Sequence, residues 1–454
     1  MAQQKRSDLW QLTWANLNGI QRTMSVEAPI KPGPSIQLTP IVSSAKAETG
    51  SAVATTLTGT IPTWLNGHMM RNGAAEWDLE KDGKVETVNH WFDGHALLHR
   101  FTITNGVVNY RNKFLRSEVY AKNRKYDRFI IGGFGTPQRH SDPCKNIFER
   151  FVAFFAPPES TDNCNVNIYP VGDRVFAFTE TCDFREIDPE TLESENRHKY
   201  TEFITVNQAT AHPMTDADGH VYNMGNTFGK NTVYNIFKMP VNNKRPEFSQ
   251  MEIVARIPAT EPKFPSYYHS FSMTSNHWLF LEMPYRFQLF KMMFRNKSTT
   301  APADTLTYKE EAYSMFRHVE KKTGRVLDIK VNTKGMGCFH FGNAFEVEVE
   351  GITFIVWDQC PNFLSAGSTH LFNIDTLRSS VDDITKAFKE AGRNEAMRYA
   401  YPISIAGGAK PGDNLNERLK GHFDTTAKAI LQEDGSILVE PEDLLSETDK
   451  KKGE

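Results

Sequence analysis

The chain has 454 residues, of which 39% are hydrophobic, 24% charged and 11% aromatic, a composition that supports a large hydrophobic core. The formal net charge of −3 at pH 7 provides no excess of cationic residues for binding nucleic acid. No stretch reaches the roughly 20 apolar residues that a membrane-spanning helix needs. The first residues also lack the apolar core of a signal peptide. We therefore expect a globular protein that neither binds nucleic acid nor crosses a membrane.

Residues 1–45 are polar and are interrupted by Pro32 and by the pair Gly33-Pro34, which predicts an N-terminal extension. Residues 46–445 carry short β-branched and aromatic runs separated by turns such as Asp82-Gly83 and Asn105-Gly106. Asp-Gly and Asn-Gly pairs between such runs indicate β-hairpins. Hairpins that recur in this way predict an all-β domain, and blades of about 40–45 residues favour a β-propeller. A large β-sandwich array fits the same pattern.

One segment near the end reads as a helix. Ser380 is suited to be its N-cap, Asp382 and Asp383 occupy its first turn, and Gly392 marks its end. Residues 446–454 carry charge and no apolar side chain, which predicts a solvated tail.

Five cysteines, an odd number without a C-x-x-C pair, predict reduced thiols and a cytoplasmic location. They are Cys144, Cys164, Cys182, Cys338 and Cys360.

Three histidines, His212, His269 and His340, lie within runs that are otherwise suited to buried strands. Their separation suits a propeller, because each blade can send one side chain to the central axis. The alternative for each is a buried histidine that is hydrogen-bonded to a carbonyl or hydroxyl group. Imidazole ligands suit iron, zinc, copper or nickel, whereas an all-nitrogen set disfavours calcium and magnesium. The pair His95 and His99 lies in a strand-like run, which would separate the two rings.

Metal-binding histidines usually donate their second ring N–H to a carboxylate. Glu180 and Glu282 are acidic residues within apolar strands and are the candidates for this role. For either one, a solvent-facing position on an edge strand is the alternative.

Six sequence motifs occur in order along the chain: IPTWLNGHMMRNG (61–73), WFDGHALLHRF (91–101), SDPCKNIFERF (141–151), ATAHP (209–213), SYYHSF (266–271) and FHFGNAFE (339–346). In these motifs the chain resembles the animal branch of the carotenoid cleavage oxygenase family, which includes the β-carotene oxygenases and the retinoid isomerohydrolase of retinal pigment epithelium.

The resemblance implies a seven-bladed propeller with a helical and loop dome over an apolar tunnel. It also implies a non-haem Fe(2+) ion held by four histidines, of which His212, His269 and His340 match the first three. Glu180 matches one of the family's three glutamates that support the ligands. The implied activity is cleavage of a carbon–carbon double bond of a carotenoid or apocarotenoid polyene with O₂. A retinoid isomerohydrolase acting on retinyl esters is similar in its site, so it remains an alternative.

The sequence departs from the family pattern at its end. The resemblance stops near Leu445, before the segment in which the family carries its fourth histidine. His370 and His422 follow His340, but neither setting resembles the terminal metal motif. We therefore expect an incomplete propeller with three histidine ligands, as in a shortened product of a complete oxygenase. A non-catalytic chain that binds apolar ligands or membranes is a further alternative.

Two apolar segments combine aromatic residues with lysine or arginine, which suits shallow insertion at a bilayer interface. In the resembling family these regions surround the tunnel mouth, so we expect peripheral contact with an intracellular membrane. The residues concerned are Cys144, Phe148, Phe151, Phe154 and Phe155 in the first segment, and Phe290 and Phe294 in the second.

Overall fold

The computed structural model describes residues 41–138, 161–295, 299–309, 312–362, 371–391 and 395–445. One compact unit spans Gln37–Leu444, and a second combines Met1–Ile36 with Leu445–Glu454. The extension and tail expected at 1–45 and 446–454 therefore lie largely outside the described residues. Within residues 41–45, Val42 is buried and the Ser44 hydroxyl donates a hydrogen bond to Asp78.

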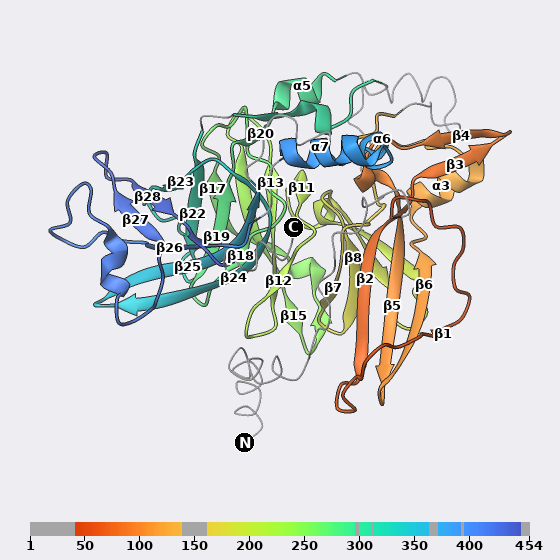
Figure 1. Cartoon of the computed structure of the whole chain (residues 1–454), viewed down its shortest axis with the longest axis horizontal. Coiled ribbons are helices and arrows are strands. Elements are labelled where there is room, and N and C mark those ends of the chain that lie inside the picture. Colours follow the sequence, from red (N-terminus) through yellow and green to blue (C-terminus); the bar gives the residue numbers. More distant parts are fainter. Residues whose placement is uncertain are drawn as a thin grey trace. The chain divides into compact units, whose positions relative to one another are not determined.

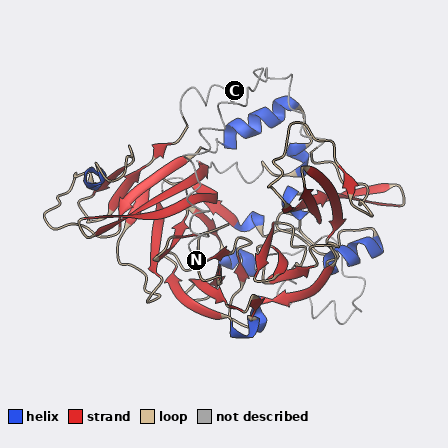
Figure 2. Cartoon of the chain, turned by 90° about the horizontal axis from the view of Figure 1, so that it is seen from below, coloured by secondary structure: helices blue, strands red, loops and turns tan. Residues whose placement is uncertain are grey.

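Strands dominate the first unit, as the sequence predicts (Figure 2). Three successive sheets run through its first half, each mainly an antiparallel array. The first has the order β1-β6-β5-β2 and the second β10-β9-β8-β7, whereas the third has the order β11-β13-β14-β17 with β12 paired to β13. Their strands are β1 (Val53–Ala54), β2 (Gly67–Glu76), β5 (His95–Thr104), β6 (Val107–Phe114), β7 (Asn167–Val171), β8 (Arg174–Phe178), β9 (Asp183–Ile187), β10 (Ser194–Lys199), β11 (Gln208–Ala209), β12 (Met214–Thr215), β13 (Val221–Thr227), β14 (Val233–Met239) and β17 (Glu252–Pro258).

Two further sheets follow, with the orders β18-β19-β22-β23-β28-β27 and β24-β25-β26-β29. Strand β28 pairs parallel to β23, so the hairpin β27–β28 returns to a sheet formed about a hundred residues earlier. The strands are β18 (Ser272–Met273), β19 (His277–Glu282), β22 (Ser314–Glu320), β23 (Val331–Thr333), β24 (Gly337–Val349), β25 (Ile352–Asn362), β26 (Met397–Pro402), β27 (Lys428–Leu431), β28 (Ile437–Glu440) and β29 (Glu442–Asp443).

Three small hairpins and a few short helices connect these sheets. The hairpins are β3–β4 (Asp78–Lys81, Lys84–Thr87), β15–β16 (Val241–Asn242, Arg245–Pro246) and β20–β21 (Tyr285–Phe287, Leu306–Tyr308). The α-helices are α3 (Glu118–Tyr126), α5 (Leu289–Met293), α6 (Ile374–Leu377) and α7 (Val381–Ala391), with 3₁₀ turns at Trp91–Asp93, Tyr200–Glu202, Phe248–Gln250, Ala303–Thr305 and Leu415–Leu419. Helices α5, α6 and α7 lie at the upper end of the sheets in Figure 1. Among the helices described, none combines the length and apolar character that crossing a membrane requires.

Local sequence signals explain several of these elements. Asn105 and Gly106 join β5 to β6 with positive φ angles of 48° and 81°, as a two-residue hairpin turn requires. The Ser380 hydroxyl accepts a hydrogen bond from the Asp383 amide at 3.3 Å and caps α7, so the predicted helix is confirmed.

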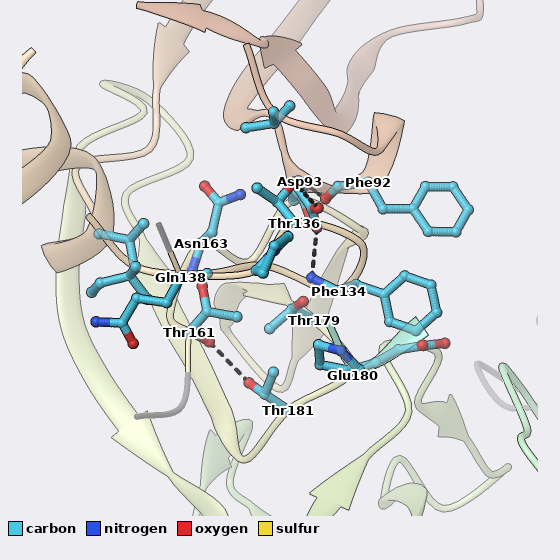
Figure 3. Close-up of a pocket in the computed structure, with 18 of the residues that line it drawn as sticks. Phe92, Asp93, Phe134, Thr136, Gln138, Thr161, Asn163, Thr179, Glu180 and Thr181 are labelled. Carbon is cyan, nitrogen blue, oxygen red and sulfur yellow. Dashed lines mark hydrogen bonds between the residues drawn. The ribbon is translucent and has the colours of Figure 1, made fainter. Parts of the chain in front are cut away.

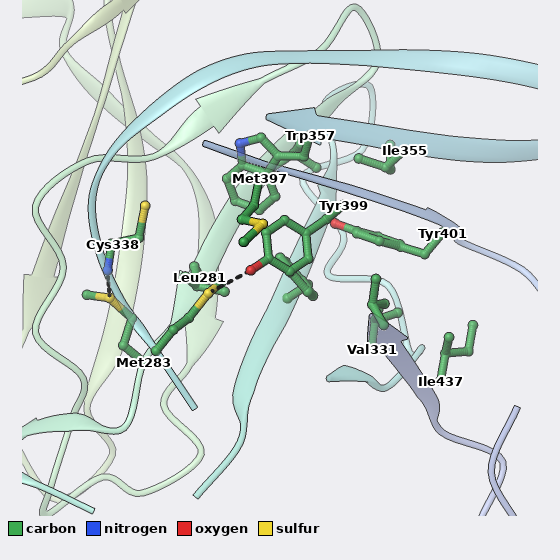
Figure 4. Packing of buried hydrophobic residues seen from close by; sticks show 14 of the residues in the cluster. Leu281, Met283, Val331, Cys338, Ile355, Trp357, Met397, Tyr399, Tyr401 and Ile437 are labelled. Carbon is green, nitrogen blue, oxygen red and sulfur yellow. Dashed lines mark hydrogen bonds between the residues drawn. The ribbon is translucent and has the colours of Figure 1, made fainter. Parts of the chain in front are cut away.

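The largest hydrophobic core lies between the sheets of β19 and β25 (Figure 4). Trp357, Tyr399 and Tyr401 are fully buried in it. The Tyr399 hydroxyl lies 3.0 Å from the Met336 sulfur, and the Cys338 amide lies 3.0 Å from the Met283 sulfur. This core holds β24, the strand that carries His340, against its neighbours.

Candidate metal centre

The three histidines singled out in the sequence meet in space. His212 lies between β11 and β12, His269 precedes β18, and His340 lies on β24, so three different sheets position them. One ring nitrogen of each lies within 4.8 Å of the others. The Nε2 atoms of His212 and His269 are 2.9 Å apart. No other group of three or more histidine, cysteine or acidic residues has this geometry within the described ranges.

Glu180 holds the His269 ring in place from the connection between β8 and β9. The Nδ1 atom of His269 lies 2.5 Å from Oε1 of Glu180. The Tyr267 hydroxyl donates to the same carboxylate, 3.0 Å from both oxygens. A carboxylate at Nδ1 keeps the proton there and leaves the Nε2 lone pair free, which is the tautomer that a metal ligand needs.

The rings of His212 and His340 are held by fewer hydrogen bonds than the ring of His269. The Asn167 amide donates to the Ala211 carbonyl at 2.9 Å and lies 3.4 Å from Nδ1 of His212. His340 is the least buried member of the cluster, and its ring has no hydrogen-bond partner in the described part of the chain. Of the three histidines, His269 is therefore the one that a carboxylate orients.

The electrostatic environment favours the neutral form of two of the three histidines, His212 and His340. Burial, together with His269 and His340, lowers the pKa of His212 from 6.5 to about 3. Burial and His269 lower the pKa of His340 to about 4. Three converging imidazoles fit a first-row transition metal such as iron, zinc, copper or nickel, and a low pKa favours binding because only the unprotonated nitrogen can bind the ion.

Glu180 and Tyr267, which contact His269, line a cavity of about 330 Å³. Figure 3 shows Glu180 among the residues of this cavity. A smaller cavity of about 50 Å³ shares Phe92, Phe134 and Tyr267 with it. Phe339, which also lines the small cavity, packs edge-on against the His269 ring at 5.2 Å between centroids. The two cavities therefore flank an aromatic wall beside the histidines.

Asp93 organises that wall, a role that the sequence did not predict. Its carboxylate accepts hydrogen bonds from the Phe134 amide at 2.6 Å, the Gly135 amide at 3.0 Å and the Thr136 hydroxyl at 2.6 Å (Figure 3). A Cβ atom at Gly133 would lie 2.3 Å from the Asp93 carboxylate, so this close approach requires glycine. Burial raises the pKa of Asp93 to about 6 despite these donors.

Comparison with known proteins assigns the chain to a family. A family model described as retinal pigment epithelial membrane protein matches residues 42–421. The chain belongs to this carotenoid oxygenase family. It is 35% identical over 407 residues to the mitochondrial carotenoid-cleaving dioxygenase of Macaca fascicularis, with 87% of this chain and 70% of the relative covered. It is likewise 35% identical over 404 residues to the human β,β-carotene 15,15′-dioxygenase, with coverages of 86% and 70%.

The solved structures agree on the fold. Cobalt-substituted apocarotenoid oxygenase from Synechocystis matches with a TM-score of 0.59 at 17% identity, covering 80% of this chain and 70% of that one. The chain therefore has the all-β fold of this oxygenase, which is consistent with a propeller. The family and the histidine cluster together indicate a metal cofactor.

Glu282 is the second candidate for the carboxylate that accepts a hydrogen bond from a metal-binding histidine. The structure gives it a different role, so this prediction is wrong. It is fully buried and forms ion pairs with Arg286 and Arg317, each at 3.0 Å. These arginines satisfy the carboxylate, so it is not available to a histidine. The expected separation of His95 from His99 is confirmed.

His95 and His99 both lie on β5 but have different hydrogen-bond partners. His95 bonds to Glu76 at 2.7 Å, whereas His99 lies 2.7 Å from the Tyr110 hydroxyl.

Of the expected membrane segments, the second is described. Phe290, Met293 and Phe294 on and after α5 are 76%, 76% and 69% exposed. We call these three side chains the α5 patch. The first segment, with Cys144, Phe148, Phe151, Phe154 and Phe155, lies outside the described residues. His370 also lies outside them, and His422 is exposed.

Proposed function

We propose that this chain is an Fe(2+)-dependent dioxygenase that cleaves a carbon–carbon double bond of a carotenoid or apocarotenoid with O₂ to give two carbonyl products. One observation carries the proposal: three histidines from separate sheets converge beside a cavity with aromatic walls. The names of the relatives support the chemistry, because they are a carotenoid-cleaving dioxygenase and a β,β-carotene dioxygenase.

In this proposal His212, His269 and His340 are the metal ligands. Iron, when bound there, supplies the activation of O₂ and the redox chemistry. Glu180 fixes the His269 tautomer, and Tyr267 donates to Glu180 and so holds that carboxylate in place. These contacts position the ligands before metal arrives, which lowers the cost of assembling the centre.

The cavity walls orient the polyene. Phe92, Phe134 and Tyr267 form the aromatic wall between the two cavities, and flat rings pack well against a flat polyene. The walls also exclude water from the reacting double bond. The proposal includes a propeller in which the sheets are blades, three of which each bring a histidine ligand towards a common axis.

The α5 patch supports a route for an apolar substrate. Exposed aromatic side chains next to Lys291 suit shallow insertion into a bilayer, where carotenoids dissolve. We therefore also propose that the protein contacts an intracellular membrane peripherally, from the cytoplasmic side.

The decisive experiment combines metal content with product analysis. Protein purified anaerobically with iron supplied is expected to carry near-stoichiometric iron, and incubation with a carotenoid and O₂ should yield aldehydes or ketones. The variant His269→Ala should lose both iron and products, whereas the exposed His422→Ala variant should keep both. An isomerised alcohol from a retinyl ester would instead indicate an isomerohydrolase. A monodisperse protein without iron or products would indicate a non-catalytic chain.

A further inference from the structure

Arg295 occupies an unusual position between the α5 patch and the large cavity. It follows Phe294 directly, yet its side chain lines the cavity together with Met292, one turn earlier. Met292 and Arg295 are partly buried, whereas Phe290, Met293 and Phe294 are exposed. The segment thus presents an apolar surface outwards and a guanidinium group inwards.

The Arg295 guanidinium has no acidic partner in the described part of the chain. Among the described residues it makes one hydrogen bond, from Nη1 to the Met292 carbonyl at 2.8 Å. Burial lowers the pKa of Arg295, and no acidic residue opposes this shift. Arginine nevertheless remains charged at neutral pH.

The two carboxylates that line the same cavity are already hydrogen-bonded to other groups. Asp93 binds the amides of Phe134 and Gly135 and the Thr136 hydroxyl. Glu180 binds His269 and Tyr267. The cavity therefore contains a partly buried cation whose remaining N–H groups have no acceptor among these acids, so these donors are available to a ligand.

The chemistry of guanidinium limits what the ligand can be. It carries five N–H donors and no acceptor, so it recognises an oxygen of a carboxylate, carbonyl or hydroxyl group. Thr179, Gln208 and Thr300 line the same cavity and add polar groups to its wall. A hydrocarbon polyene offers this cation no acceptor, whereas an oxygenated one does.

We propose that Arg295 binds an oxygen at one end of the polyene, so that the preferred substrates are carotenoids or apocarotenoids with an oxygenated end group. The inference rests on the proposed function for the presence of a polyene in the cavity. It deepens that function by assigning a residue that determines specificity.

Equilibrium binding to the metal-free protein tests the inference without requiring turnover. Three probes of similar length suffice: an apocarotenoic acid, the corresponding aldehyde and a hydrocarbon carotene, each followed by quenching of tryptophan fluorescence. The variant Arg295→Met should weaken binding of the acid about tenfold or more, since a charge-assisted hydrogen bond is lost, and leave hydrocarbon binding within about twofold. Arg295→Lys, which keeps the charge, should retain much of the affinity for the acid.

The matched control is Arg325→Met, which makes the same chemical change at an exposed residue in the turn after β22. It should leave all three affinities unchanged. Equal losses for acid and hydrocarbon in Arg295→Met, no loss for either, or no binding of the acid by the wild-type chain would each overturn the inference. A further outcome would also overturn it: Arg295→Met binds all three probes as the wild type does but sediments less with phosphatidylserine vesicles. The oxygen that Arg295 binds would then belong to a lipid headgroup. Carotene cleavage that persists alongside any of these results would leave the proposed function intact.

Discussion

The Nδ1 atom of His269 lies 2.5 Å from Oε1 of Glu180, although 89 residues separate them in the chain. This contact joins the connection between β8 and β9 to the segment that precedes β18. It gives one ligand of the proposed metal centre a defined tautomer and orientation.

Replacing Glu180 by glutamine should therefore weaken metal binding. The amide keeps the size of the side chain but removes the charge that holds the proton on Nδ1, so affinity should fall about 10- to 100-fold. Competition with a chelator of known affinity measures the change. Glu433→Gln, at an exposed position, is the control and should bind metal as the wild type does. Unchanged affinity in Glu180→Gln would show that the carboxylate does not support the ligand.

Stability should fall in mildly acidic solution because two histidines away from the cluster are buried in the neutral form. Burial lowers the pKa of His90 to about 4 and that of His318 to about 3. The unfolded chain takes up these protons near pH 6.5, whereas the folded chain does so only near pH 4 and below. The stabilisation is thus complete above pH 6.5 and is lost as the pH falls from 6.5 towards 4.

Urea unfolding at pH 7, 6 and 5 measures this loss, which should exceed about 1 kcal/mol per histidine. The variant His318→Gln cannot titrate and should show a shallower pH dependence, even if it is less stable at pH 7. An identical slope in the variant and the wild type would contradict the prediction.

Adding a methyl group at Gly133 should disturb the loop that Asp93 holds. The new Cβ would lie 2.3 Å from the Asp93 carboxylate, so Gly133→Ala must break contacts of that carboxylate at a cost of about 1–3 kcal/mol. Thermal unfolding measures the stability, and polyene binding reports on the cavity wall. Gly229→Ala is the control, because no heavy atom lies within 4 Å of its Cβ position. Equal melting temperatures for both variants would rule out the proposed crowding.

Removing the α5 patch should reduce binding to membranes. The double variant Phe290→Ser/Phe294→Ser loses two exposed aromatic groups, and its partition into liposomes should fall about tenfold or more. Co-sedimentation measures the partition. Trp64→Ser removes an equally exposed aromatic group, 79% exposed, in the loop before β2 and should have little effect. If both proteins sediment as the wild type does, α5 is not the membrane contact.

The sequence predicted the features that short-range chemistry controls. Asn105-Gly106 indicated a hairpin because few residue pairs tolerate two positive φ angles, and Ser380 indicated a helix start because its hydroxyl can cap an amide. Strand-like runs singled out His212, His269 and His340, the family motifs matched them to metal ligands, and the structure brings these three together.

The tertiary structure alone decided which distant groups meet. Glu180 and Glu282 look alike in the sequence, but one faces His269 and the other is surrounded by arginines. Asp93 and Arg295 gave no signal, because their roles depend on a loop amide and a cavity wall supplied by other segments. The parallel pairing of β28 with β23 likewise could not be predicted from the sequence. Alternation and turn residues specify a strand, but the choice of its partner depends on the packing of surfaces that lie far apart in the chain.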